Sequence, residues 1–249
     1  MQKTLKKYFV IFTVPTLLAF SFAFVIPFIM GVYMSFCEFT TVDNAKFVGI
    51  ENYVKAFVGS SSFMSAFGFT VKFVIVAILV VNLGAFGLAM LLTKKIRGTN
   101  IFRTVFFMPN LIGGIVLGYT WQQIGYMMII YIAGLQNVPT DLIEAAKIDG
   151  ATGWQTLKNV TIPMVMPSIT VCTFLTLSNS FKLYDQNLAL TAGAPSHKTE
   201  MLALNIVDTF YGRTGFQGVG QAKAVVFFII VAVVGAVQLV FTRNKEVDQ

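Results

Sequence analysis

A polar segment at residues 141–163, DLIEAAKIDGATGWQTLKNVTIP, lies between long apolar stretches and carries the most distinctive residue spacing in the chain. Glu144, Ala145 and Ala146 are consecutive, and Gly150 follows four residues after them. Alanine side chains lack bulk, so the backbone of another protein can approach such a segment closely. The residue types therefore suit a contact with another protein, with a plain amphipathic hairpin at a membrane surface as the alternative.

A second group of chemically competent side chains consists of hydroxyls in the apolar stretch that follows. Thr173, Thr176 and Ser180 are spaced three and four residues apart, which places them on one side of a helix. Such a face could hydrogen-bond a polar ligand. Serine and threonine also commonly bond across packed membrane helices or to their own backbone. The pattern leaves both interpretations open.

Signatures of catalysis and metal binding are missing from the sequence. It contains no G-x-x-x-x-G-K-[ST], H-E-x-x-H or G-x-S-x-G motif. His197 is the single histidine, and Cys37 and Cys172 lie at or within apolar runs, where cysteine acts as a small hydrophobe. We therefore expect no catalytic residues, no metal site and no cofactor bound by this chain.

Local signals predict how the polar segment folds. The D-x-x-E pattern at 141–144 and the T-x-x-Q pattern at 152–155 both fit capping boxes, which mark helix starts. Gly150 lies between them, where a chain reversal is easiest. Pro163 can open the next helix, because its missing N–H costs nothing at a first turn. The segment should therefore form two short helices that lead into a longer one.

The composition indicates a membrane protein. Of the 249 residues, 56% are hydrophobic and 12% are charged, about half the roughly 25% that soluble domains carry. A membrane-crossing helix needs about 20 mostly apolar residues. The candidate runs are 9–36, 69–92, 102–118, 164–183 and 222–241, with a shorter run at 126–135. We expect an all-α polytopic membrane protein with a single domain over residues 1–249.

The positive charges predict the orientation in the membrane. Eleven of the 18 basic residues lie in the N-terminal segment, the 93–103 loop, the 138–163 loop and the C-terminal segment, whereas the alternate loops hold five. Basic residues accumulate on the cytoplasmic side. Those four segments, with both termini, should therefore be cytoplasmic. The net charge of +7 reflects this topology rather than a nucleic-acid partner.

Termini on the same side require an even number of crossings, and one region is too short for this. Residues 102–137 number 36, whereas two crossings need about 40 residues plus a turn. We expect about six helices with a truncated third and fourth pair. The native protein should carry a further segment near 122–125. The alternative is a short re-entrant hairpin that turns tightly at Gln123 and Gly125.

The polar segment resembles the cytoplasmic EAA loop of the membrane subunits of binding-protein-dependent ABC importers. The match comprises Glu144, Ala145, Ala146, Gly150 and the V-x-I-P run at 160–163, where the family has I-x-L-P. Further similar elements are GIENY at 49–53, FRTVFFMPN at 102–110, GLQNVP at 134–139, IDGA at 148–151 and GAP at 193–195 with T at 199, where the family has GGP. These elements resemble the carbohydrate-uptake branch of maltose-type and multiple-sugar permeases.

This resemblance implies a type I ABC importer permease fold and a place in the prokaryotic cytoplasmic membrane. The implied partners are an ATPase dimer that uses ATP and Mg²⁺, a second permease subunit, an extracytoplasmic solute-binding protein and a sugar or oligosaccharide. The loop at 141–163 would dock on the ATPase. The implied coupling residues are Glu144, Ala145, Ala146, Asp149, Gly150 and Pro163.

Alignment with maltose-type permeases places Tyr126, Thr176 and Ser180 on the substrate path. Near the outer end of the helix that holds Thr176 and Ser180, Lys182 and Asp185 are three residues apart and should form an ion pair at the membrane interface; the alternative is a functional role for these charges within the membrane. The alternative function is a secondary transporter driven by an ion gradient. Such a protein needs ionisable groups near the middle of the membrane, but these spans are almost free of acids.

Overall fold

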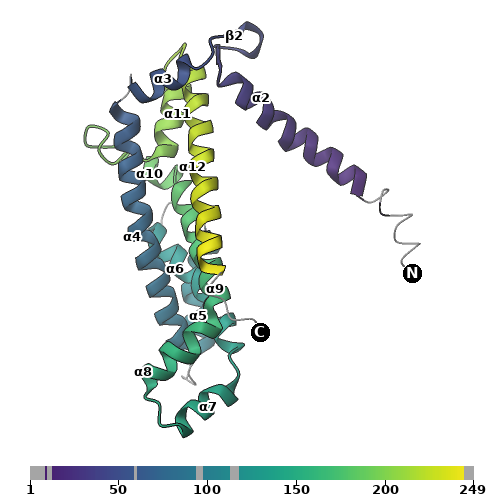
Figure 1. The fold of residues 1–249 in the computed structure, drawn as a ribbon. Coiled ribbons are helices and arrows are strands. Elements are labelled where there is room, and N and C mark those ends of the chain that lie inside the picture. Colours follow the sequence, from purple (N-terminus) through teal and green to yellow (C-terminus); the bar gives the residue numbers. More distant parts are fainter. Residues whose placement is uncertain (1–8, 10–12, 59–60, 94–97, 113–117, 244–249) are drawn as a thin grey trace. The chain divides into compact units, whose positions relative to one another are not determined.

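The structure is a computed structural model of residues 1–249, and it describes residues 9, 13–58, 61–93, 98–112 and 118–243. The described residues are mostly helical, with one two-stranded antiparallel sheet (Figure 1). The chain forms two compact units: Met1–Phe63 with Asn205–Phe228, and Met64–Leu204 with Ile229–Gln249. The largely helical architecture agrees with the predicted α-helical membrane fold, to which the short β1–β2 pair is the one addition among the described residues.

The first unit combines the N-terminal helices with a small sheet. Its elements are the π turn η1 (Ser21–Val25), α2 (Ile26–Met34), β1 (Cys37–Glu38), the 3₁₀ turn η2 (Val42–Asn44), β2 (Lys46–Phe47) and α3 (Glu51–Val58). Strand β1 pairs with β2 in the register Cys37 with Phe47. The Asn52 side chain donates to the carbonyls of Ser35 and Cys37, at 3.0 and 2.8 Å, and so ties α3 to the chain around β1.

The second unit holds the polar loop and its supporting helices. From Ser61 onward the helical elements of the chain, in order, are α4 (Ser61–Leu92), α5 (Thr99–Ile112), α6 (Tyr119–Gln136), α7 (Thr140–Ile148), α8 (Gly153–Thr156), the π turn η3 (Leu157–Thr161), α9 (Ile162–Phe181), α10 (Asp185–Leu190), α11 (Leu202–Gly212), most of which belongs to the first unit, and α12 (Gln217–Arg243). Helices α4, α11 and α12 each cross from one unit to the other.

The core of the second unit lies where α4, α6 and α9 pack together. Ala85 and Ala89 of α4 are buried with Met127 and Tyr131 of α6, because small side chains on α4 let the bulky residues of α6 fit closely. The Tyr131 hydroxyl donates to Asn82 Oδ1 on α4 at 2.7 Å. This packing holds α6 and α9, the two helices that flank the polar loop.

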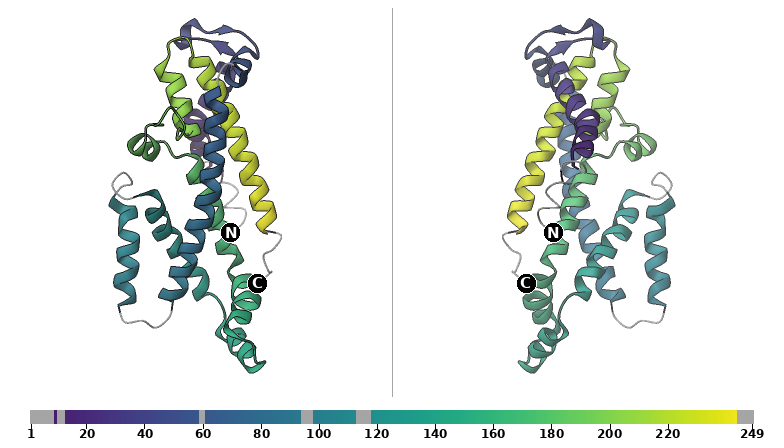
Figure 2. Two further views of the ribbon diagram at one scale, coloured as in Figure 1. Left: turned by 90° about the vertical axis from the view of Figure 1, so that its left-hand side faces the viewer. Right: turned by 90° about the vertical axis from the view of Figure 1, so that its right-hand side faces the viewer.

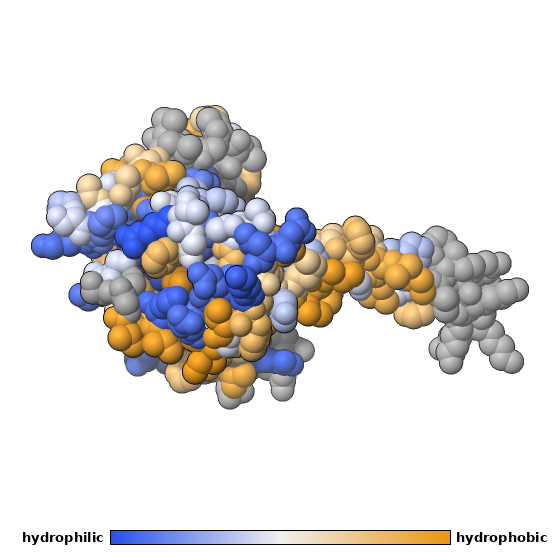
Figure 3. Space-filling view, turned by 90° about the horizontal axis from the view of Figure 1, so that it is seen from above, coloured by the Kyte–Doolittle hydropathy of each residue, from blue (hydrophilic) through white to orange (hydrophobic). Residues whose placement is uncertain are grey.

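Among the described residues, four helices are long and apolar enough to cross a membrane: Thr13–Met34, Ser62–Leu92, Gly153–Phe181 and Gln217–Arg243. They match four of the predicted runs. Many of their large apolar side chains are exposed, and Figure 3 shows such hydrophobic residues on the surface, as lipid contact requires. Helices α5 and α6 have 14 and 18 residues and are not among the four. The count of about six crossings stays a prediction.

The tight turn at Gln123 and Gly125, which was the alternative to a missing segment, is not present. Both residues lie inside α6, which is continuous from Tyr119 to Gln136. Helix α5 packs beside α6 (Figure 2), and the two connect through residues 113–117, which lie outside the described part. Gly125 permits this packing, because a Cβ at that position would collide with the backbone carbonyl of Phe106. A helix forms because no residue near 122–125 breaks its hydrogen-bond ladder.

Candidate functional site: the polar loop and the cavities beside it

The polar loop is a helix–turn–helix at one end of the second unit (Figure 1). Helix α7 ends at Ile148, and the chain reverses at Gly150, whose φ of +78° favours glycine. The Ala151 N–H donates to the Ala146 carbonyl at 2.9 Å, a bond across the turn that satisfies one of the last carbonyls of α7. The predicted pair of short helices around Gly150 is therefore present.

One of the two predicted capping boxes forms. At the start of α8, the Gln155 N–H donates to Thr152 Oγ1 at 3.4 Å, and the Thr152 N–H donates to Gln155 Oε1 at 2.7 Å. The other box, at 141–144, is wrong: α7 begins at Thr140 after Pro139, with no side-chain cap. Pro139 is itself extended and precedes the helix, so the helix starts at Thr140, two residues earlier than a cap at Asp141 would require.

The residues predicted to dock on a partner lie mainly on the outside of the loop. Glu144, Ala145, Asp149 and Gly150 are exposed, and Ala146 is half-buried. A Cβ at Gly150 would meet no atom within 4 Å. Large apolar side chains accompany them on the same loop, with Ile148 86% and Trp154 69% exposed. Exposed apolar side chains beside polar ones are typical of a protein interaction surface.

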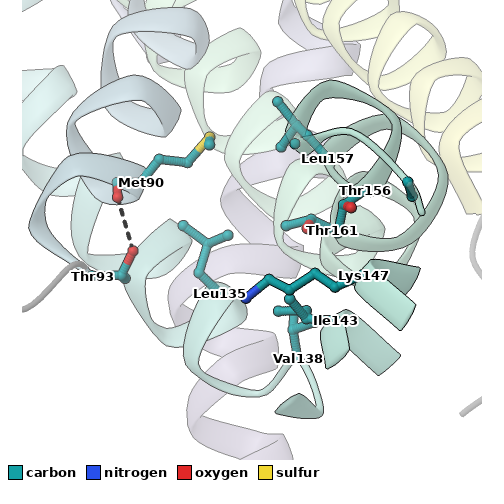
Figure 4. Close-up of a pocket in the computed structure, with 11 residues that line it drawn as sticks. Met90, Thr93, Leu135, Val138, Ile143, Lys147, Thr156, Leu157 and Thr161 are labelled. Carbon is teal, nitrogen blue, oxygen red and sulfur yellow. Dashed lines mark hydrogen bonds between the residues drawn. The ribbon is translucent and has the colours of Figure 1, made fainter. Parts of the chain in front are cut away.

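Behind the loop lies a cavity of about 400 Å³ (Figure 4). Met90 and Thr93 line it from the end of α4, and Leu135 lines it from the end of α6. Ile143 and Lys147 line it from α7, and the Lys147 side chain extends toward Leu135 in Figure 4. Helix α7 therefore lines the cavity with one face and carries the exposed docking residues elsewhere.

The prediction that Pro163 opens a new helix is wrong: Pro163 is the second residue of α9, but α8 and η3 run into α9 without a break, so it lies inside the helix. The π turn η3 comes immediately before α9, and the whole stretch Gly153–Phe181 forms one continuous helix. A proline inside a helix removes one backbone donor and crowds the preceding turn, and the wider π turn gives room for it. The loop is thus joined to a membrane-spanning helix without a flexible linker.

The three predicted substrate-path residues are not brought into one open site. Thr176 and Ser180 share a side of α9, and both are fully buried. The Ser180 hydroxyl lies 2.8 Å from the Tyr119 hydroxyl on α6. Thr176 Oγ1 has no hydrogen-bond partner within the described part of the chain. Tyr126 is half-buried and packs against the core. Their role in substrate binding stays a prediction.

A polar cavity of about 300 Å³ opens one turn beyond these hydroxyls, between the start of α6 and the end of α9. Sequence reasoning missed its lining, which is dominated by carboxamides: Tyr119, Gln122, Gln123, Asn179, Lys182, Leu183 and Gln186. No helical spacing in the sequence could have found it, because Asn179 lies on α9, Lys182 follows the end of that helix and Gln186 lies on α10. Gln123 Oε1 is buried without a hydrogen-bond partner among the described residues.

A second cavity of about 300 Å³ adjoins the polar one. The two share Tyr119, Leu183 and Gln186, and Phe69 and Phe73 of α4 add aromatic walls to the second. The Phe73 and Tyr119 rings lie 5.9 Å apart between centroids. The two cavities thus place two kinds of group side by side. Carboxamides can hydrogen-bond the hydroxyl groups of a ligand, and aromatic rings can cover the apolar face of a ligand's ring.

The predicted ion pair between Lys182 and Asp185 is wrong: in the described structure no salt bridge joins them. Helix α9 ends at Phe181, and Asp185 starts α10 after a break, so the two residues do not share a helix face. Lys182 lines the polar cavity instead.

The burial of a second basic residue, Lys223, was not predicted from the sequence. Lys223, placed by its sequence in an outer loop, is 2% exposed within α12 and donates to Asn205 Oδ1 at 2.9 Å.

Comparison with known proteins identifies the family. Residues 88–246 match the family described as "Binding-protein-dependent transport system inner membrane component". The chain belongs to this family. It is 40% identical, over 96% of its length and 94% of the relative, to the probable starch degradation products transport system permease protein AmyD of Thermoanaerobacterium thermosulfurigenes. It is 29% identical, over 99% of both chains, to the multiple sugar-binding transport system permease protein MsmF of Streptococcus mutans.

The fold of the permease is also found in a solved structure. A chain of a bacterial ABC transporter involved in the import of the acidic polysaccharide alginate superposes with a TM-score of 0.81 over 98% of both chains, at 18% identity. The predicted type I ABC importer fold is therefore confirmed. The chain is a multi-pass membrane protein and a transport subunit.

The relatives carry residues that this chain lacks. The alignment with AmyD spans 278 positions, whereas 96% of the 249 residues is about 239, so at least about 39 positions face a gap in this chain. The alignment with MsmF spans 290 positions over 99% of the chain, about 247 residues. These lengths agree with the short stretch noted between 102 and 137. The further native segment stays a prediction.

Proposed function

We propose that this permease forms the translocation path for a sugar or oligosaccharide in an ATP-driven importer, and that a separate ATPase subunit drives it. The observation that carries the proposal is the exposed helix–turn–helix loop at one end of the second unit, with Glu144 and Gly150 at the spacing of the EAA pattern. A loop with this shape can enter a cleft on a partner, because its turn has no side chain and its alanines add little bulk.

The mechanism follows from the way in which the loop is attached. Closure of an ATPase dimer would pull on α7 and α8, and the continuous helix Gly153–Phe181 would carry that motion toward the polar cavity at its far end. Rigid helices transmit displacement with little loss, and such shear and hinge motions can alternate access to a site. Gly150 comes before the α8–η3 segment and Pro163 comes after it, so the two residues lie at the two ends of the segment that would be pulled.

A sugar substrate is supported by the cavities and by the relatives' names. The lining offers four carboxamides, which donate and accept hydrogen bonds as sugar hydroxyls require. Phe69, Phe73 and Tyr119 give aromatic surface beside them. The relatives named above are described as transporting starch degradation products and multiple sugars. We therefore assign the polar cavity, with Tyr126, Thr176 and Ser180 behind it, to the sugar path.

The remaining partners follow from the family. A second, homologous permease would complete the path, and an external solute-binding protein would deliver the sugar. A related solved structure contains an alginate transporter in complex with an alginate pentasaccharide-bound periplasmic protein. The alternative, an ion-driven transporter, needs acids within the membrane. The four candidate spans contain no Asp or Glu, which favours the ATP-driven importer.

The test uses the transporter assembled with its partner subunits. We expect Glu144→Lys and Gly150→Pro to abolish substrate-stimulated ATP hydrolysis and to weaken co-purification of the ATPase, while the permease still inserts. Asp141→Lys is the matched control, because it reverses an exposed charge on the same helix outside the EAA spacing. Normal stimulation in both Glu144→Lys and Gly150→Pro would refute the proposed coupling.

A further inference from the structure

The cavity behind the loop has the chemistry of an amphiphile site. Met90, Leu135, Val138 and Leu157 give it apolar walls. Lys147 is the single charged side chain among its described lining residues, and no carboxylate lines it. Lys147 is exposed, and Figure 4 shows its side chain extending from α7 toward Leu135, another residue that lines the cavity. A volume of about 400 Å³ is within the usual range for small-molecule pockets.

The position of the cavity gives its depth in the membrane. The candidate span of α4 ends at Leu92, so Met90 and Thr93 lie at the end of a membrane helix. The predicted topology makes this end cytoplasmic. The cytoplasmic leaflet presents negatively charged headgroups, and basic pockets between membrane helices on that side bind them. An isolated cation at this depth is complementary to such a headgroup.

We propose that this cavity binds an acidic phospholipid of the cytoplasmic leaflet, with its phosphate on Lys147 and an acyl chain along the apolar walls. The proposal rests on the cytoplasmic placement of the loop in the proposed function. The Lys147 ammonium offers three donors to a phosphate. Ile143 and Lys147 are one turn apart on the same face of α7, so a bound lipid contacts this helix and the ends of α4 and α6 together.

The lipid would therefore brace the ATPase-docking loop against the membrane helices. When it is bound, a pull on α7 moves the ends of α4 and α6 as well. When it is absent, the empty cavity leaves α7 with less contact to the end of α4. Coupling efficiency would then depend on the acidic lipid content of the inner leaflet, a form of regulation that acts on this permease rather than on the ATPase.

The test is native mass spectrometry of the assembled transporter after purification in detergent supplemented with phosphatidylglycerol or phosphatidylcholine. We expect the wild type to retain phosphatidylglycerol in preference to phosphatidylcholine. Lys147→Gln should retain about tenfold less, because a charge-assisted contact is lost. Lys158→Gln, which removes an exposed cation from the same loop outside the cavity, should retain as much as the wild type.

Three outcomes would overturn the proposal: no retained lipid in the wild type, equal losses in the two variants, or retention of a mass corresponding to a free fatty acid instead of a phospholipid. Lys147→Arg keeps the charge and should keep the lipid, which separates loss of binding from loss of folding. Lipid retention is measured without transport. The lipid proposal can therefore fail while the test of ATPase coupling at Glu144 succeeds, and the coupling test can fail while the lipid is retained.

Discussion

Replacement of Gly134 by alanine probes the contact that holds the two flanks of the polar loop together. Gly134 lies in the last turn of α6, against α9. A Cβ at this position would collide with the Ser168 hydroxyl, and it would lie 2.9 Å from Ser168 Cβ and 3.3 Å from Val165 Cγ1. Ser168 Cβ is attached directly to the backbone of α9. The two helices must therefore move apart to admit the methyl group.

Two opposing contributions decide the size of the effect. Glycine to alanine within a helix stabilises it by about 1 kcal/mol through intrinsic propensity. Overpacking in a well-packed interior costs about 1–3 kcal/mol. Because the colliding atoms of Ser168 include one that no rotamer change can move, we expect the overpacking cost to exceed the gain in propensity. The expected net loss is up to about 2 kcal/mol, which is up to roughly a thirtyfold fall in the folded-to-unfolded ratio.

The assay is reversible denaturation of the purified permease in mixed micelles, followed by circular dichroism. The matched control is Gly87→Ala in α4, where an added Cβ meets no atom within 4 Å and should be neutral or stabilising. Ser168→Ala removes the colliding hydroxyl, so in combination with Gly134→Ala it should recover part of the lost stability. A coupling free energy of about 0.5 kcal/mol or more in this double-mutant cycle is expected for residues in contact.

Equal stability of Gly134→Ala and Gly87→Ala would refute the reasoning, because it would mean that α6 and α9 do not approach closely at this point. Absence of coupling with Ser168→Ala would show that another residue receives the added methyl group. Either result would also remove the structural basis for a rigid connection on both sides of the loop.

Three further measurements test other parts of the account. Gln123→Leu should impair sugar uptake without preventing assembly, whereas Gln136→Leu, at the exposed inner end of the same helix, should not; unimpaired uptake in Gln123→Leu would place the sugar path elsewhere. A cysteine label at Asn159 should react only from the cytoplasm and one at Ser196 from outside, and an external signal at Asn159 would reverse the topology. Intact-protein mass spectrometry of the natural protein should give a mass above 27.4 kDa, because a further native segment is expected near 122–125; a mass of 27.4 kDa would reject that segment.

Much of the local structure could be predicted because it depends on neighbouring residues. The turn at Gly150 and the capping box of Thr152 follow from backbone and side-chain preferences within a few positions. The predicted capping box at 141–144 does not form, and the reason is also local, since the helix begins directly after Pro139. The tight turn at Gln123 and Gly125 failed because it was inferred from membrane thickness, not from any turn-forming residue.

The sequence by itself determined the membrane class, four of the long apolar helices, the family and the spacing of the docking loop. These depend on composition and on short-range pattern, which are complete in the linear chain. The tertiary structure alone decided that Thr176 and Ser180 are buried, that carboxamides from α6, α9 and α10 line one cavity, and that Lys147 lies in another. Helical periodicity fixes which residues share a face, but the packing of one helix on another decides which face meets protein and which meets open space.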